Sequence, residues 1–274
     1  MKTVKAGNLE INNEKPFTLL AGPCQLEGLD HARMMCTEIL EACSTTNTPL
    51  IFKSSYDKAN RTSVDSERGL GMEKGLEVLA AIKDELGVPI VTDVHEISHC
   101  AKAAEVVDVI QIPAFLCRQT DLLVAAGETG KCINVKKGQF LAPHDMANVA
   151  AKVASTGNEN IMLCDRGTSF GYNMLVSDFR CIPIMSETGY PVVFDATHSV
   201  QMPSGQGKTS GGKREFVPPL ATAAASIGVG AIFIETHQDP DNAPCDGPNM
   251  VCVQKLRGLI EKLSAHDRLA KNID

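Results

Sequence analysis

Polar residues that can bind a metal ion or a phosphate group follow a series of short apolar segments along this chain. The residues at the segment ends are Cys24, Lys53, Asp93, Gln111, Lys136, Arg166, His198 and Glu235. If the segments are strands of a parallel barrel, their carboxyl ends all open on one face, and side chains far apart in the sequence meet at one site. A shared mouth lined by such residues is typical of an enzyme.

Four of the chemically active residues suit a divalent cation. They supply a thiol, an imidazole and two carboxylates: Cys24, His198, Glu235 and Asp246. This mixture of sulfur, nitrogen and oxygen donors is suited to Fe²⁺, Zn²⁺, Mn²⁺ or a similar ion. No local spacing motif joins the four residues, and Cys24 alone could equally be a small buried apolar residue. We interpret the neighbouring Cys245 and His237 as packing or surface residues.

Cations and hydroxyl groups concentrate in the segment Lys53 to Ser63, directly after an apolar segment. This composition is suited to a phosphorylated substrate, with a solvated charged loop as the alternative. Lys136 and Arg166 add cations at two further segment ends. A lysine at the end of a strand, among apolar neighbours, is costly unless it meets an anion. We therefore expect at least one phosphate group at the mouth, together with a carboxylate.

Two further segments could take part in catalysis. Asp93 and His95 end an apolar segment and are candidates for acid–base chemistry or for binding hydroxyl groups. The segment 201–213 is rich in Gly, Ser and Lys, which predicts a mobile flap over the mouth, with a plain surface loop as the alternative. Gly207-Lys208-Thr209 imitates the end of a P-loop, but Met202 occupies the position of the first required glycine.

The elements that must position these residues alternate between two periodicities. The predicted strands are Phe17 to Gly22, Leu50 to Ser54, Pro89 to Asp93, Val107 to Ile112, Cys132 to Lys137, Ile161 to Asp165, Pro191 to Asp195 and Ala231 to Glu235. The predicted helices are Asp30 to Cys43, Leu70 to Leu86, Asp121 to Glu128, Met146 to Ala154, Phe216 to Ile227 and Val251 to Leu263. The alternation predicts an α/β fold, a (β/α)8 TIM barrel. Residues 1–15 precede it and contain a short hairpin around Gly7-Asn8 that closes the base of the barrel.

Length and composition agree with a single domain over residues 1–274. The chain has a mass of 29.3 kDa and 43% hydrophobic residues, close to the size of one such barrel. A net charge of -7 argues against a nucleic-acid surface, and no apolar segment is long enough to span a membrane. The ten cysteines are dispersed without paired spacing, and the N-terminus has no secretory signal. We expect a cytoplasmic protein without disulfides.

Several segments carry a family resemblance that covers Phe17 to Leu263. They are Ala21 to Cys24, Lys53 to Ser63, Thr92 to Glu96, Gln111 to Asp121, Asn134 to Phe140, Asp195 to Ser199 and Glu235 to His237. Together these segments closely resemble the 3-deoxy-D-manno-octulosonate 8-phosphate synthase family. The resemblance implies a transferase that condenses phosphoenolpyruvate with D-arabinose 5-phosphate and water, giving the eight-carbon acid sugar phosphate and phosphate for lipopolysaccharide biosynthesis. It also implies a homotetramer.

The resemblance also implies roles for individual residues. The metal ligands would be Cys24, His198, Glu235 and Asp246, since metal-independent members carry Asn in place of Cys24 and Pro in place of Gly138. The residues that would hold phosphoenolpyruvate are Lys53, Lys58, Gln111, Lys136 and Arg166. The residues that would face the sugar phosphate are Asn60, Arg61, Thr62 and Asp93, where Thr62 replaces a more usual Ser. Arg118 matches a residue that reaches a neighbouring subunit's site. Lys58, Asp93 and His198 are the candidates for proton transfer.

Three alternatives differ in substrate or in class. A related barrel enzyme, 3-deoxy-D-arabino-heptulosonate 7-phosphate synthase, uses erythrose 4-phosphate, but it carries Pro-Arg after the lysine where this chain has Ala59-Asn60-Arg61. A non-catalytic phosphosugar-binding barrel would be expected to lack a metal ligand or a phosphate-binding cation, and none is missing here. A metal-dependent hydrolase would normally gather several histidines at its site rather than one thiol and many cations.

Overall fold

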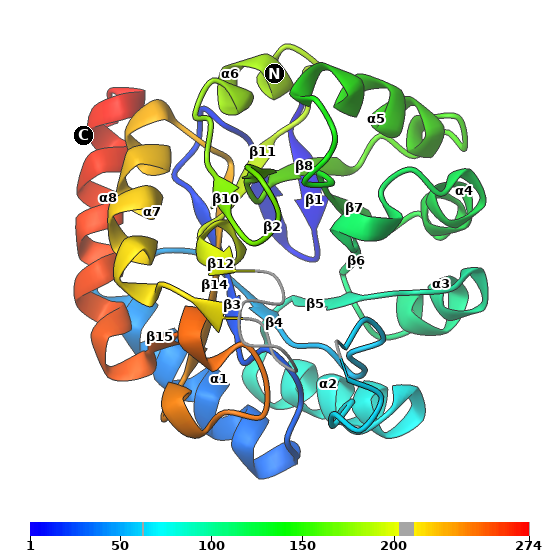
Figure 1. Cartoon of the computed structure of the whole chain (residues 1–274), viewed down its shortest axis with the longest axis vertical. Helices are drawn as coiled ribbons and strands as arrows, with labels where there is room; N and C mark the ends of the chain where they lie inside the picture. Colours follow the sequence, from blue (N-terminus) through cyan, green and yellow to red (C-terminus); the bar gives the residue numbers. More distant parts are fainter. Residues whose placement is uncertain (62, 203–210, 274) are drawn as a thin grey trace.

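Eight parallel strands close into a barrel within residues 1–61, 63–202 and 211–273, which are the residues that the computed structural model describes. In order around the barrel they are β3 (Thr18–Gly22), β4 (Leu50–Lys53), β5 (Ile90–Asp93), β6 (Val109–Ile112), β7 (Cys132–Lys136), β8 (Ile161–Asp165), β11 (Val192–Asp195) and β14 (Ala231–His237). The barrel closes because β14 pairs with β11 on one side and with β3 on the other. The prediction of a (β/α)8 barrel is confirmed (Figure 1).

Helices surround the barrel on the outside (Figure 1). They are α1 (Leu29–Ser44), α2 (Met72–Leu86), α3 (Ile97–Ala104), α4 (Thr120–Glu128), α5 (Met146–Ala154), α6 (Cys181–Ser186), α7 (Val217–Ile227) and α8 (Leu256–Lys271). The sequence reading missed α3 and α6. Helix α3 buries only the small residues Cys100 and Ala103, and α6 is six residues long with Pro183 near its start. Neither presents the wide apolar stripe that identifies a helix in a sequence.

The predicted helix from Val251 was wrong at its beginning. Val251–Cys252 instead forms strand β15, which pairs in parallel with the end of β14. A short 3-10 turn follows, and α8 begins at Leu256. The pairing extends β14 as far as His237, beyond the predicted end at Glu235.

Alternate residues of each strand enter two different cores, as the period of a strand requires. Leu19 and Ala21 of β3 pack outward against the helices, whereas Leu20 between them packs inside the barrel. The predicted hairpin is formed by β1 (Val4–Ala6) and β2 (Leu9–Ile11). Its Val4, Ala6 and Ile11 side chains join the inner core and close the base of the barrel.

The predicted flap at 201–213 lies only partly within the described residues. In the segment 201–213, β12 (Gln201–Met202) pairs with β13 (Gly211–Gly212), and residues 203–210 lie outside the described residues. Motion of this flap stays a prediction.

The ten cysteines are free, and all but Cys252 are buried. Among the described residues, no helix is both long and apolar enough to cross a membrane.

Candidate active site

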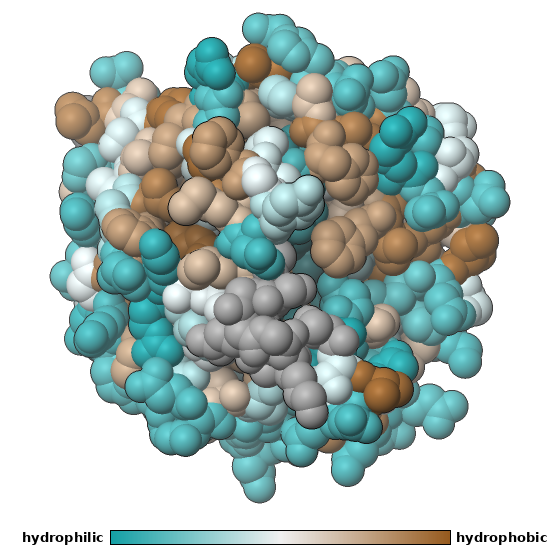
Figure 2. All heavy atoms as spheres, in the orientation of Figure 1, coloured by the Kyte–Doolittle hydropathy of each residue, from teal (hydrophilic) through white to brown (hydrophobic). Residues whose placement is uncertain are grey.

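A cavity of about 490 Å³ opens at the carboxyl ends of the barrel strands. Figure 2 looks onto this face of the molecule and shows a hollow beside the residues drawn in grey. The predicted site residues that line the cavity are Lys53, Lys58, Asn60, Arg61, Asp93, Gln111, Lys136, Arg166, His198, Glu235 and Asp246. The barrel therefore brings residues from seven strands and their loops to one mouth, as expected for this fold.

The four predicted metal ligands meet at one side of the cavity. The Cys24 Sγ lies 3.4 Å from Asp246 Oδ2, and the Nε2 of His198 lies 3.7 Å from both Asp246 Oδ2 and Glu235 Oε2. Glu235 is fully buried, and its Oε2 has no hydrogen-bond partner among the described residues. A buried carboxylate oxygen without a donor is costly, and a cation between these four groups would satisfy it. The donor set therefore fits a divalent metal ion.

A carboxylate outside the cavity wall orients His198. Asp195 Oδ2 lies 2.8 Å from the Nδ1 of His198, and Asp195 Oδ1 accepts the His198 backbone N–H. With Nδ1 at Asp195, the ring turns its Nε2 toward Glu235 and Asp246. Metal-binding histidines are commonly held in this way by a second carboxylate. Burial raises the pKa of Asp195, but His198 and Lys136 outweigh burial and hold that pKa well below its usual value.

Two of the predicted phosphate-binding lysines already have carboxylate partners. Lys53 Nζ lies 2.8 Å from Glu235 Oε1, and Lys136 Nζ lies 2.6 Å from Asp195 Oδ2. Lys136 also lies 3.9 Å from the centroid of the Phe233 ring. All four charged groups are at most 7% exposed, so solvent screens the attraction within each pair only weakly.

Arg166 has hydrogen-bonding capacity that the protein does not use. Its side chain is buried, and Nη2 donates to Gln201 Oε1 at 2.8 Å. Its Nε and Nη1 have no acceptor among the described residues. Burial lowers the pKa of this guanidinium, while the neighbouring Asp195 and Asp246 oppose that shift. A buried cation with two free donors next to a cavity is suited to binding an anion.

A chain of hydrogen bonds connects Lys58 with Asp93, which both line the cavity. Lys58 Nζ donates to Ser55 Oγ at 2.9 Å, Ser55 Oγ donates to Asp93 Oδ1, and Asp93 Oδ2 lies 2.9 Å from His95 Nε2. Burial opposes the charge on both ends of the chain. The neighbouring Cys24 and Glu235 nevertheless raise the pKa of Lys58, and His95 and Lys58 lower the pKa of Asp93.

The remaining predicted residues differ in their placement. Gln111 is buried and accepts a hydrogen bond from Asn134 Nδ2 at 3.2 Å, while Arg61 donates to the Pro244 backbone oxygen at 3.1 Å. Thr62 lies outside the described residues. Arg118 is exposed and does not line the cavity of its own chain.

The sequence reading missed Asp195, Ser55 and Gln201 as site residues. Asp195 ends its strand, so the same rule that selected Lys53 and Asp93 could have found it. Ser55 and Gln201 lie within the segments Lys53 to Ser63 and 201–213, where composition did not single them out, and only their hydrogen bonds reveal them.

Comparison with known proteins agrees with this geometry. The model of the DAHP synthetase I family matches residues 2–271. The chain belongs to the DAHP synthetase I family. A relative from Granulibacter bethesdensis is 59% identical over 270 residues, 98% of this chain and 96% of that protein. Relatives from Brucella anthropi and Brucella ovis are 59% and 58% identical over 271 and 269 residues, which cover 99% and 98% of this chain and 98% and 97% of those proteins. All three relatives are named 2-dehydro-3-deoxyphosphooctonate aldolase.

Membership of the DAHP synthetase I family, together with these relatives, confirms the resemblance read from the sequence. The family match spans the barrel and the N-terminal hairpin, including every strand that carries a candidate site residue.

Proposed function

We propose that this chain is a 3-deoxy-D-manno-octulosonate 8-phosphate synthase, the activity also named 2-dehydro-3-deoxyphosphooctonate aldolase. It condenses phosphoenolpyruvate with D-arabinose 5-phosphate and water, and it releases inorganic phosphate and the eight-carbon acid sugar phosphate used in lipopolysaccharide biosynthesis. The observation that carries the proposal is Arg166, which lines a cavity beside a metal-type donor set and has two donors without an acceptor among the described residues. The names of the similar bacterial proteins support the same activity.

Phosphoenolpyruvate would bind at Arg166 and the cations around it. Its phosphate and carboxylate groups would be held by the side chains Lys53, Lys58, Gln111, Lys136 and Arg166. Lys53 and Lys136 already neutralise Glu235 and Asp195, so most of the uncompensated positive charge comes from Arg166 and Lys58. Holding both anionic groups would orient the weakly nucleophilic C3 of the enol toward the sugar aldehyde.

Arabinose 5-phosphate would extend from the metal side toward the loop after β4. Arg61 and Thr62 would bind its phosphate, while Asn60 and Asp93 would bind its hydroxyl groups. In support, Asn60, Arg61 and Asp93 share the lining of one cavity, and Arg61 Nε is a buried donor without an acceptor among the described residues. C3 of phosphoenolpyruvate would attack the aldehyde carbon, water would add at C2, and phosphate would leave by cleavage of the C–O bond.

A divalent ion such as Mn²⁺, Fe²⁺ or Zn²⁺ would be held by Cys24, His198, Glu235 and Asp246. Such an ion would polarise the aldehyde or lower the pKa of the attacking water. Burial raises the pKa of the Cys24 thiol well above its usual value, so binding of the ion would have to displace the thiol proton. His198 would then serve as a ligand. Lys58 and Asp93 would then transfer protons. Hydrogen bonds through the Ser55 hydroxyl group connect the two residues.

The active form would be a cytoplasmic homotetramer. In support, exposed aromatic side chains lie on the loops after β6, β7 and β8: Phe115, Phe140, Phe170 and Tyr172, at 58%, 62%, 68% and 100% exposure. Figure 2 shows hydrophobic side chains across this part of the face. Exposed apolar clusters of this kind commonly mark subunit contacts. Arg118 is exposed on the loop after β6, from which it could reach the site of a second subunit.

The decisive experiment presents the purified protein with phosphoenolpyruvate and each candidate aldose phosphate in competition. Phosphate release should show a higher kcat/KM for arabinose 5-phosphate, because erythrose 4-phosphate is one carbon too short to bring its aldehyde to the enol when its phosphate is bound. A misplacement of about 1 Å can cost on the order of a hundredfold in rate. Equal or better use of erythrose 4-phosphate would instead identify the heptulosonate synthase, and binding without turnover would identify a sensor.

Metal analysis of the same sample tests the cofactor. Chelation should abolish turnover, and addition of Mn²⁺ or another divalent ion should restore it. Full activity in protein shown to be free of metal would contradict the assignment of the four ligands.

A further inference from the structure

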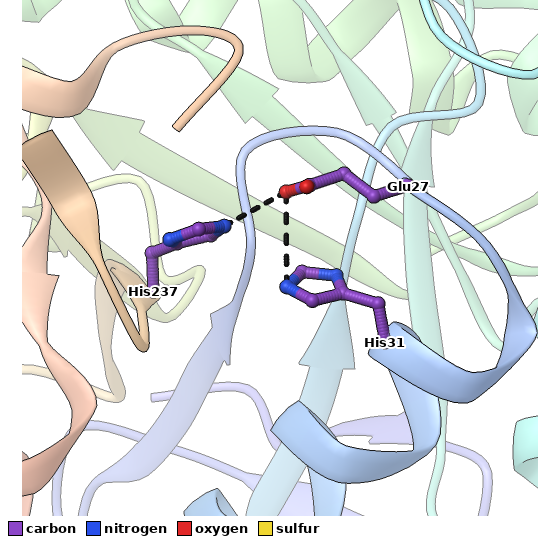
Figure 3. A group of neighbouring side chains, drawn as sticks. All are labelled: Glu27, His31 and His237. Atoms are coloured by element: carbon purple, nitrogen blue, oxygen red, sulfur yellow. Dashed lines mark hydrogen bonds and ion pairs between the residues drawn. The ribbon is translucent and has the colours of Figure 1, made fainter. Parts of the chain in front are cut away.

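Three side chains outside the cavity converge at the outer rim of the barrel: Glu27, His31 and His237 (Figure 3). Glu27 lies in the loop between β3 and α1, His31 lies in the first turn of α1, and His237 ends β14. The catalytic proposal uses none of these three side chains. From the sequence, His237 was interpreted as a packing or surface residue.

The distances between their polar atoms are close to those around a bound ion. The Nε2 of His237 donates to Glu27 Oε1 at 2.8 Å, and the Nε2 of His31 lies 3.7 Å from the same oxygen. One ligand atom from each residue lies within 4.8 Å of the other two. Ligands of a tetrahedral Zn²⁺ stand about 3.3 Å apart, since each bond measures about 2.0 to 2.1 Å. Side-chain shifts of up to about 2 Å would therefore bring the ligand atoms to the distances around a tetrahedral ion.

The surroundings allow an ion to enter and to stay. The side chains of His237, His31 and Glu27 are 4%, 14% and 28% exposed, so the site is anchored in the protein and open on one side. Burial raises the pKa of Glu27, but the two histidines outweigh burial and lower it, so Glu27 is a carboxylate at neutral pH. The side-chain oxygen of Gln238 lies 2.9 Å from His31 Nε2 and is a fourth possible ligand next to the three.

We propose that Glu27, His31 and His237 form a second transition-metal site, distinct from the donor set at the mouth. Two imidazoles and one carboxylate suit Zn²⁺, Co²⁺ or Ni²⁺. The Gln238 amide oxygen or water takes the remaining position. The inference stands on these side chains and does not depend on the reaction proposed for the mouth.

One hydrogen bond sets the order in which the two sites fill. The Asp239 backbone N–H donates to His237 Nδ1 at 3.1 Å, so without an ion the proton of this ring is on Nε2. An ion at Nε2 moves that proton to Nδ1 and breaks the bond from Asp239. Binding therefore costs this hydrogen bond as well as those from the Nε2 atoms of His237 and His31 to Glu27 and Gln238, and the second site should fill after the first.

An ion at the second site would stabilise the segments that carry the first. Glu27 is three residues after Cys24, and His237 is two residues after Glu235. A bond from each to one ion would tie the loop after β3 to the end of β14. The expected role is structural support of the mouth.

Titration of metal-free protein with Co²⁺ alone distinguishes the two sites by their spectra. Thiolate ligation at Cys24 gives a charge-transfer band in the near ultraviolet, whereas a site of imidazoles and carboxylate gives only the weak visible bands. Wild-type protein should bind a first equivalent with the charge-transfer band and a second equivalent without it. A single equivalent in wild-type protein would overturn the proposal.

Matched variants assign the second equivalent to the cluster. His31→Leu should lose only the equivalent without the charge-transfer band, and Glu27→Gln, which keeps a hydrogen-bond acceptor for His237, should weaken it by at least about tenfold. His144→Ala removes an exposed imidazole elsewhere and should lose neither equivalent. If His31→Leu binds the same number of Co²⁺ ions as wild-type protein with unchanged affinity, the three side chains form only a hydrogen-bonded cluster.

Discussion

At the residue scale, the anion site that we propose depends most on Arg166. Its guanidinium is 5% exposed, has one hydrogen bond to Gln201 and leaves two donors free. We expect Arg166→Ala to reduce kcat/KM for phosphoenolpyruvate, because a buried charge-assisted contact is lost. The loss should correspond to on the order of 2–4 kcal/mol of transition-state stabilisation. Steady-state kinetics with phosphoenolpyruvate as the varied substrate would measure this loss.

The control for Arg166 is Arg180→Ala. Arg180 is 84% exposed and bonds only Asp178 among the described residues, so its removal should leave kcat/KM within about twofold. The placement of the anion site is wrong if the two variants, both folded, have the same kinetics.

Asp93 links the charge of the mouth to acid stability. His95 and Lys58 lower its pKa in the folded protein despite burial, so the folded state binds this proton less tightly than the unfolded chain, whose Asp has a pKa of about 3.9. The stabilisation is therefore complete above that pH and is lost as the pH falls through the lower, folded pKa. We expect Asp93→Asn to lower the free energy of unfolding at pH 7, and the deficit should shrink below about pH 4.

Urea unfolding of both proteins across this pH range is the measurement. A deficit that stays constant down to the lowest pH at which both proteins fold would mean that packing, and not the charge of Asp93, is responsible.

At the scale of elements, the close approach of β3 to β4 requires a glycine at position 22, two residues before Cys24. A Cβ atom on Gly22 would lie 1.9 Å from the backbone oxygen of Lys53, which belongs to the neighbouring strand and cannot move alone. Gly22→Ala should therefore force the strands apart and destabilise the protein by about 1–3 kcal/mol or more. Thermal or urea unfolding would measure it.

Gly258→Ala is the matched control, because a Cβ atom on Gly258 in α8 meets nothing within 4 Å. This change should stabilise the helix by roughly 0.5–1 kcal/mol. Equal stability of the two variants would show that the contact of Gly22 with Lys53 does not constrain the barrel.

At the scale of the whole molecule, Arg118 is the residue that a single chain cannot explain. It is exposed and absent from the lining of its own cavity, although its sequence context resembles a residue that serves a neighbouring site. If the site is shared between subunits, Arg118→Ala and Arg166→Ala should each be impaired alone. Mixed oligomers should regain activity, because some sites then combine an intact Arg118 with an intact Arg166.

Co-expression of the two variants with different tags, followed by purification of the mixed oligomer, provides the assay. Activity of the mixed oligomer no higher than that of either variant alone would place Arg118 outside the catalytic sites, and a monomeric protein would exclude sharing altogether.

The sequence alone was sufficient for the barrel and for most of the residues at its mouth. Strand composition and period locate β3, β4 and β5 within one or two residues, because buried parallel strands are short and nearly continuously apolar. The strand-end rule then selects Lys53, Asp93 and other lining residues without knowledge of the structure. Short elements such as α3 were missed, because eight residues with two small buried side chains give little periodic signal.

Only the tertiary structure decided how these residues share their charges and protons. The pairs Lys53–Glu235 and Lys136–Asp195 join strands far apart in the sequence, and no local pattern predicts which cation meets which carboxylate. The orientation of His198 Nε2 and the free donors of Arg166 are likewise properties of distances between elements. Types and spacing of residues fix which groups reach the mouth, whereas closure of the barrel fixes which of them remain free to bind a ligand.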